Sequence, residues 1–113
     1  MRRIILSLLP KTEIKKQLKT IKNWHFENNT IKKEFNFQTY MDSIAFINQL
    51  AEISEKNNHH PDMYIGWCKI NLTFTSHDFG GVTKACITMA KAADEIFLRK
   101  NSSRSLNNYC TGK

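Results

Sequence analysis

Residues 55–81, EKNNHHPDMYIGWCKINLTFTSHDFGG, hold the signals that decide the fold of this 113-residue chain. Proline disfavours the helical conformation of the residue before it, so a helix that arrives from the N-terminal side ends at or before His60. Apolar and polar side chains then alternate over residues 69–76, which predicts a β-strand. The pair Gly80 and Gly81 predicts a turn directly after that strand. The segment therefore predicts a helix end, strands and a tight turn in succession.

Three of the four histidines lie in this stretch. His59 and His60 are adjacent and close to the predicted helix end, and His77 closes the predicted strand. Because two element ends can meet at one cleft, we expect the three imidazoles to converge. Imidazole has an ordinary pKa near neutral pH, so it can both donate and accept protons there. The trio predicts acid–base chemistry, and a zinc site helped by Asp62 or Asp78 is the alternative.

The segments on either side predict the rest of the domain. Apolar residues recur with helical spacing after Thr12, Thr39 and Thr83, each of which suits the N-cap position. Residues 30–37 alternate like a strand and follow a turn at 27–29, which predicts a hairpin. The expected elements are a helix over 13–22, strands over 24–26 and 30–37, a helix over 40–57, strands over 63–67 and 69–76, and a helix over 84–98.

This order predicts an α+β fold, α-β-β-α-β-β-α: a single domain in which a four-stranded antiparallel sheet has three helices packed on one face. We expect the domain to cover residues 12–99, between an N-terminal leader over 1–11 and a polar, mobile tail over 100–113. The leader begins like a signal peptide, but its apolar run is very short. No segment approaches the roughly 18 apolar residues that span a bilayer, so no membrane contact is expected.

The charge is uneven: the net charge is +7, and much of it lies at or before Lys33. We interpret this as a solvated basic surface, with attraction to nucleic acid as a minor alternative. Direct nucleic-acid binding is not expected, because aromatic residues are not interleaved with the basic ones. Three widely spaced cysteines, at positions 68, 86 and 110, form no CxxC pair. They predict a reduced protein of the cytoplasm, with the nucleus as the alternative.

The histidine stretch resembles the signature of the pterin-4a-carbinolamine dehydratases. The residues that carry the resemblance are Glu55, His59-His60-Pro61, an aromatic residue at Tyr64 or Trp67, and His77. Trp24 and Phe35-Asn36-Phe37 also fall in the family's order, so the resemblance covers most of the chain. One departure is Cys86, since the family usually has an aspartate nine residues after the last histidine. Cys86 is expected in the first turn of the last helix, so we expect this change to affect helix stability rather than chemistry.

The resemblance implies a function and a set of site residues. It implies dehydration of a 4a-hydroxytetrahydropterin, the 4a-carbinolamine, to quinonoid dihydropterin and water in tetrahydrobiopterin recycling, without cofactor or metal. It implies that His59 and His77 transfer protons and that His60, also catalytic, binds and supports. The implied substrate-binding residues are Asn58, His59, His60, Thr75, Ser76, His77, Asp78 and Trp24, with Glu55 and Pro61 in support. Two alternatives stay open: Trp24 is an aromatic wall or a packed core residue, and Glu55 orients a histidine or is simply solvated.

The resemblance also implies partners. Subunits of the family join their sheets edge to edge and their helices side by side, which implies a homo-oligomer, a tetramer in preference to a dimer. Some members act as dimerisation cofactors for a homeodomain transcription factor. The alternative function is therefore that of a protein-binding coactivator that stabilises dimers of a DNA-binding protein.

Overall fold

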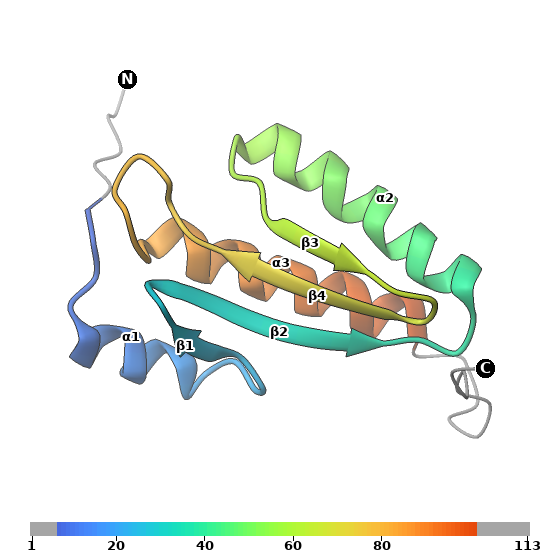
Figure 1. The fold of residues 1–113 in the computed structure, drawn as a ribbon, viewed down its shortest axis with the longest axis horizontal. Helices are drawn as coiled ribbons and strands as arrows, with labels where there is room; N and C mark the ends of the chain where they lie inside the picture. The colour runs from blue at the N-terminus through green and yellow to red at the C-terminus, as the bar shows by residue number, and fades with distance from the viewer. Residues whose placement is uncertain (1–6, 102–113) are drawn as a thin grey trace.

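A computed structural model describes residues 7–101 of the chain. It contains three helices and one four-stranded antiparallel sheet in the predicted order, so the predicted α+β fold is confirmed (Figure 1). The elements are α1 (Lys11–Leu18), β1 (His25–Glu27), β2 (Thr30–Asn36), α2 (Tyr40–Asn57), β3 (Asp62–Ile65), β4 (Lys69–Phe74) and α3 (Lys84–Asn101).

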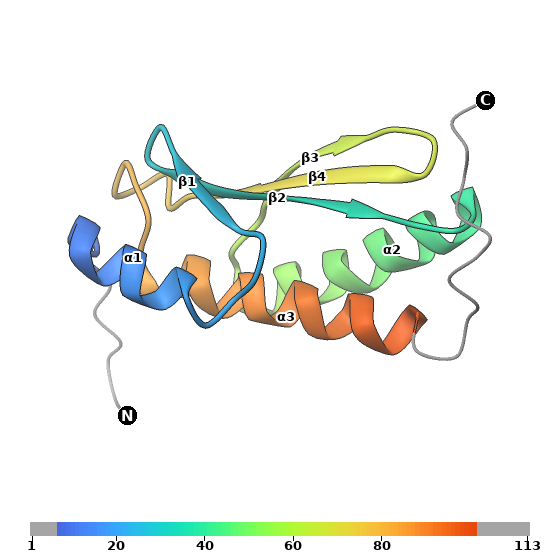
Figure 2. The ribbon, with the colours of Figure 1, turned by 90° about the horizontal axis from the view of Figure 1, so that it is seen from below.

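The sheet has the strand order β1-β2-β4-β3, so β1 and β3 form its edges. The central pair β2 and β4 runs in register from Ile31 opposite Phe74 to Asn36 opposite Lys69. All three helices cover the same face of the sheet, and no helix of residues 7–101 lies on the opposite face (Figure 2). The architecture is thus two layers, as the alternation of polar and apolar residues along the strands predicts.

The core lies between these layers and is rich in aromatic side chains. Phe46 of α2 is fully buried, and its ring centroid lies 5.1 Å from that of Phe35 and 5.2 Å from that of Phe37. Phe97 of α3 approaches the same rings at 5.2–5.3 Å. Tilted and edge-to-face contacts at such distances are the favourable arrangements of aromatic pairs. This cluster joins α2 and α3 to the sheet.

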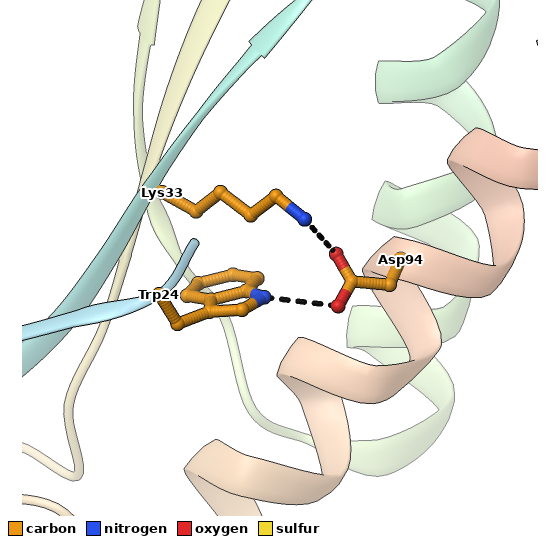
Figure 3. Close-up of polar contacts among 3 residues, drawn as sticks. All are labelled: Trp24, Lys33 and Asp94. Atoms are coloured by element: carbon orange, nitrogen blue, oxygen red, sulfur yellow. Dashed lines mark hydrogen bonds and ion pairs between the residues drawn. The ribbon is translucent and has the colours of Figure 1, made fainter. Parts of the chain in front are cut away.

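A second contact joins α3 to the β1–β2 end of the sheet (Figure 3). The Trp24 indole N–H donates to Asp94 Oδ2 at 3.0 Å, and Lys33 Nζ lies 2.7 Å from Asp94 Oδ1. Both charged side chains are largely removed from water, so each is stabilised by the other and would be costly to bury alone. Asp94 therefore fixes Trp24 as a core residue.

Two predicted boundaries differ from the structure. Helix α1 begins at Lys11 with Pro10 as its N-cap, not at residue 13 with Thr12, because the Pro10 carbonyl accepts the N–H groups of Glu13 and Ile14 at 2.9 Å. Strand β4 ends at Phe74 rather than at residue 76; Ser76 forms an isolated β-bridge with Gly81, and the turn covers residues 77–80. His77 consequently lies in a turn instead of at a strand end.

The two ends of the domain also show differences in detail. Leu8 forms a β-bridge with Thr83, and the Leu9 N–H donates to the Val82 carbonyl at 2.9 Å. Residues 8 and 9 of the expected leader are therefore attached to the domain. At the other end α3 continues to Asn101, and the rest of the expected mobile tail, residues 102–113, lies outside the described residues.

The cysteines differ from the expectation of a fully reduced protein. Cys86 is free and buried, as expected, but Cys68 is disulfide-bonded, which the spacing of the three cysteines did not predict.

A separate observation concerns membranes: within residues 7–101, no helix combines the length and the apolar character that a bilayer span requires.

Candidate active site

The first two histidines are positioned by the end of α2. The helix closes with Asn58 in the left-handed conformation, at φ 51°, which asparagine tolerates better than most residues. The His59 N–H then donates to the Ser54 carbonyl at 3.1 Å, which caps the last turn. Pro61 prevents a further helical turn, and β3 begins directly after it. The prediction that this helix ends before the proline is confirmed.

The third histidine is positioned by a tight turn after β4. The Ser76 N–H donates to the Gly81 carbonyl at 2.8 Å, and the Ser76 carbonyl accepts the N–H groups of Phe79 and Gly80 at 2.9 and 2.8 Å. Gly80 has a φ of +72°, a backbone conformation that residues other than glycine rarely adopt. The turn therefore needs its glycine, as the sequence predicted, and it carries His77 at a fixed place.

The helix end and the turn meet at one pocket of about 440 Å³, a size typical of small-molecule sites. The lining residues come from these two segments alone: Asn58, His59, His60, Pro61, Asp62, Thr75, Ser76, His77, Asp78 and Phe79. The structure thus brings the three histidines together around one opening. It also brings there the residues of the Thr75–Asp78 segment and Asn58.

Trp24 is the predicted site residue that the structure does not bring to this pocket. Its side chain is only 4% exposed, and it packs in the core against Phe35 and Phe74 while bonding to Asp94. The structure therefore shows that Trp24 is a packed core residue and not an aromatic wall of the pocket. Trp24 reaches the site only indirectly, because Phe74 in turn contacts His59.

Two lining residues were missed from the predicted binding set. Asp62 follows Pro61 at the start of β3, and it had been considered only as a helper for a metal. Phe79 lies in the turn between Asp78 and Gly80. A large aromatic residue beside a histidine, in a turn that ends in two glycines, was the available signal for Phe79.

Glu55 contacts His60, which answers the question left open by the sequence. Glu55 Oε2 lies 2.6 Å from His60 Nε2, across the end of α2. Both side chains are more than half exposed, so the contact adds little to folding stability. The contact places a carboxylate beside the imidazole of His60.

His59 has a different environment from its neighbour. Its ring stacks on Phe74 at a centroid distance of 5.9 Å and an interplanar angle of 10°. Its Nε2 atom is buried and has no hydrogen-bond partner among residues 7–101. Burial lowers the pKa of His59 below its ordinary value, and the charges of His60 and His77 lower it further. His59 is therefore neutral at neutral pH, with an unused ring nitrogen.

This lowered pKa predicts a dependence of stability on pH. The unfolded chain binds a proton at His59 near pH 6.5, whereas the folded chain binds it only at lower pH. The stability associated with neutral His59 is therefore fully present above pH 6.5 and is lost as the pH falls toward the folded-state pKa. Urea unfolding at pH 7.5 and 5.5 should show a loss of free energy of unfolding at the lower pH.

Two substitutions by glutamine test this assignment, with His25→Gln as the control for His59→Gln. His59→Gln should reduce the loss between the two pH values by more than His25→Gln does, because His25 is an exposed residue of the opposite edge strand β1. Equal effects of both substitutions would contradict the placement of His59.

For metal binding, the geometry offers little. Within the part of the chain that the structure describes, no three His, Cys, Asp or Glu side chains are grouped as a metal ion would require. The pocket's donors are spread over its two walls instead.

Known proteins share both the sequence pattern and the fold. The pattern of the family described as pterin 4 alpha carbinolamine dehydratase matches residues 7–96. A protein of Prochlorococcus marinus, provisionally named pterin-4-alpha-carbinolamine dehydratase, is 35% identical over 92 residues, which cover 81% of this chain and 97% of that protein. A protein of Nostoc punctiforme with the same provisional name is 37% identical over 89 residues, 79% of this chain and 96% of its own.

Two solved structures are similar. A transcriptional coactivator/pterin dehydratase from Brucella melitensis superposes with a TM-score of 0.78 at 26% identity, over 80% of this chain and 98% of that one. A pterin dehydratase-like protein, identified as a RuBisCO assembly factor in the alpha-carboxysome, gives a TM-score of 0.55 at 25% identity, over 66% and 86% of the two chains. With a family pattern that extends from Ser7 to Ile96 and relatives that align over nearly their whole length, this chain belongs to the pterin-4a-carbinolamine dehydratase family.

Proposed function

We propose that this protein dehydrates a 4a-hydroxytetrahydropterin to the quinonoid dihydropterin and water, as a step in tetrahydrobiopterin recycling. The observation that carries the proposal is that His59, His60 and His77 line one open pocket in a chain of this family. Three imidazoles supply proton transfer near neutral pH without a covalent intermediate.

The reaction needs two proton transfers. The bond between the carbinol carbon and its hydroxyl oxygen breaks, and the leaving oxygen takes a proton to become water. The ring nitrogen next to that carbon loses its proton, and its electrons form the new C=N double bond. One side chain therefore has to donate a proton and another has to accept one.

The environments of the histidines support a division of these roles. We assign proton acceptance to His59, because it lines the pocket and its lowered pKa leaves the imidazole unprotonated and able to accept a proton. We assign proton donation to His77, which lines the same pocket from the turn and is exposed there. His60 is assigned to substrate binding, since Glu55 already holds its Nε2 at 2.6 Å.

The test is a dehydration assay with a synthetic 4a-hydroxytetrahydropterin. The purified protein should accelerate formation of the quinonoid dihydropterin, followed by its absorbance, in proportion to protein concentration. The uncatalysed reaction in the same buffer gives the baseline, and a metal chelator tests the zinc alternative. A rate equal to the baseline at every protein concentration would refute the proposal.

We place the coactivator function second. A similar structure is described as both coactivator and dehydratase, and another as an assembly factor, so this fold serves protein binding in other chains. However, stabilising a partner's dimer does not need three imidazoles around one pocket. The histidines therefore favour the enzyme.

We also propose that the protein is a homo-oligomer through edge strand β3. Among residues 7–101 this strand pairs with β4 alone, and Met63, Tyr64 and Ile65 along it are exposed, as is Trp67 just beyond it. An apolar edge with free backbone donors and acceptors tends to pair with another strand. A second copy, with its β3 antiparallel to this one, would cover it, and a contact between helices would complete a tetramer.

Light scattering at micromolar concentration should therefore give the mass of a tetramer, or of a dimer if only the edges pair. Ile65→Lys should shift the mass toward the monomer, because it places a charge in the apolar edge. Lys69→Ala, in the neighbouring strand β4, is the matched control and should leave the mass unchanged. A wild-type protein that is monomeric throughout this range would refute the proposal.

A further inference from the structure

We infer that Phe79 is the aromatic wall of the pocket, which packs against the planar amide and guanidine part of the substrate's pyrimidine ring and sets its affinity. The inference rests on the proposed function, because it takes the substrate to be a pterin. Among the described residues that line the pocket, Phe79 supplies the one phenyl ring. The sequence suggested Trp24 for this task, but Trp24 is buried in the core.

The location of Phe79 is unusual for an apolar side chain. Its side chain is 40% exposed, on a turn between Asp78 and Gly80, and it is not part of the buried core. A single exposed apolar residue is ordinary on a protein surface. Phe79 differs because it lies on the wall of a concave site next to His77, where a ligand would cover its ring. Ligand sites commonly combine such apolar walls with a few polar groups.

The turn that carries Phe79 is held by hydrogen bonds. The Phe79 N–H donates to the Ser76 carbonyl at 2.9 Å, and the Ser76 Oγ lies 2.7 Å from the Oγ1 of Thr83, the residue just before α3. Cys86 Sγ, fully buried, approaches the same Ser76 Oγ at 3.6 Å. The buried side chains of Ser76, Thr83 and Cys86 therefore pin the turn to α3 from behind the pocket. These contacts hold the backbone that carries both His77 and Phe79.

A wall of this kind favours a ligand with a planar part. The carbinol carbon of the substrate is tetrahedral, but the amide and guanidine atoms of its pyrimidine ring lie in one plane, with polar groups at the edge and faces that hydrogen bonds cannot hold. The lining residues with polar side chains, such as Asn58 and Asp62, suit the edge, and a phenyl ring suits a face. Because the turn is already ordered, stacking costs little conformational entropy on binding. The ring would thus hold the pterin in the pocket, while the polar groups at its edge set its orientation toward the histidines.

The experiment compares Phe79→Leu and Phe79→Tyr with the wild type. We measure kcat and KM for the dehydration, and Kd for 7,8-dihydropterin, which has no hydroxyl group to lose. Phe79→Leu should raise KM and Kd by about tenfold, since stacking of an aromatic side chain on a base is worth about that much. The kcat should change little, because Phe79 transfers no proton. Phe79→Tyr keeps the ring and should restore both constants.

Tyr40→Leu is the matched control, because Tyr40 is 47% exposed and lies at the far end of α2 from the pocket. It should leave KM and Kd unchanged. Light scattering and a melting curve on each variant separate stacking from assembly or folding. A Phe79→Leu protein with wild-type KM and Kd, or one whose changes follow a change in oligomeric mass, would overturn the inference.

The outcomes also separate this inference from the proposed function. If the wild type does not accelerate dehydration, the proposed function fails, and the Kd of 7,8-dihydropterin for Phe79→Leu and wild type still decides whether Phe79 stacks. If the wild type is active and Phe79→Leu behaves like it, only the inference about Phe79 fails.

Discussion

His59→Ala and His77→Ala should each lower the rate of 4a-hydroxytetrahydropterin dehydration by about 10²–10⁴-fold, or roughly 3–5 kcal/mol of barrier. Each substitution removes a group that we assign to a proton transfer, and water in its place is not held in position. His59→Ala removes the acceptor whose pKa is lowered by burial and by the charges of His60 and His77. His77→Ala removes the donor from the Ser76–Gly81 turn.

The measurement is kcat under saturating substrate, together with KM. Both residues lie outside the regular elements, so circular dichroism should show that the fold persists in each variant. His60→Ala is the informative comparison, because it should raise KM more than it lowers kcat. Wild-type kcat in both His59→Ala and His77→Ala would remove the histidines from the mechanism, even if the protein proves to be a dehydratase.

Phe46→Ala should lower the free energy of unfolding by about 3–5 kcal/mol, the usual cost of replacing a buried phenylalanine by alanine. Phe46 is 0% exposed, and its ring touches those of Phe35, Phe37 and Phe97, so a cavity would open between α2, α3 and the sheet. Helix propensity does not explain such a loss, because alanine is the better helix former. For a domain whose total free energy of unfolding is about 5–15 kcal/mol, a loss of this size leaves the folded state only slightly more stable than the unfolded state.

Chemical denaturation with urea measures this loss. Met41→Ala is the matched control, because Met41 is in the same helix and 70% exposed, so its change should stay within about 0.5 kcal/mol. A Phe46→Ala protein as stable as Met41→Ala would mean that the aromatic cluster is not the centre of the core. We expect the loss of core packing also to lower the activity, because His59 and His60 directly follow α2.

Local chemistry in the sequence determined the element order and the walls of the pocket. Pro61 and the left-handed Asn58 fix where α2 ends, and Gly80 fixes the turn after β4, because each acts on its own backbone. Alternation along β2 and β4 fixes which face of the sheet is buried, because the side-chain period of a strand is two. These local rules were sufficient to predict that His59 and His60 follow a helix end, whereas His77 lies in the turn after β4 and not at the strand end that was predicted.

Only the tertiary structure decided which residues each of these side chains contacts. Trp24 is a core residue because Asp94, seventy residues away, accepts its N–H, and no local pattern encodes that pairing. The pKa of His59 depends on burial and on charges from a separate segment. Helix α1 starts at Lys11, right after Leu8 and Leu9 pair with Thr83 and Val82, across the fold. Such contacts join residues far apart in sequence, and their energies exist only once the layers pack.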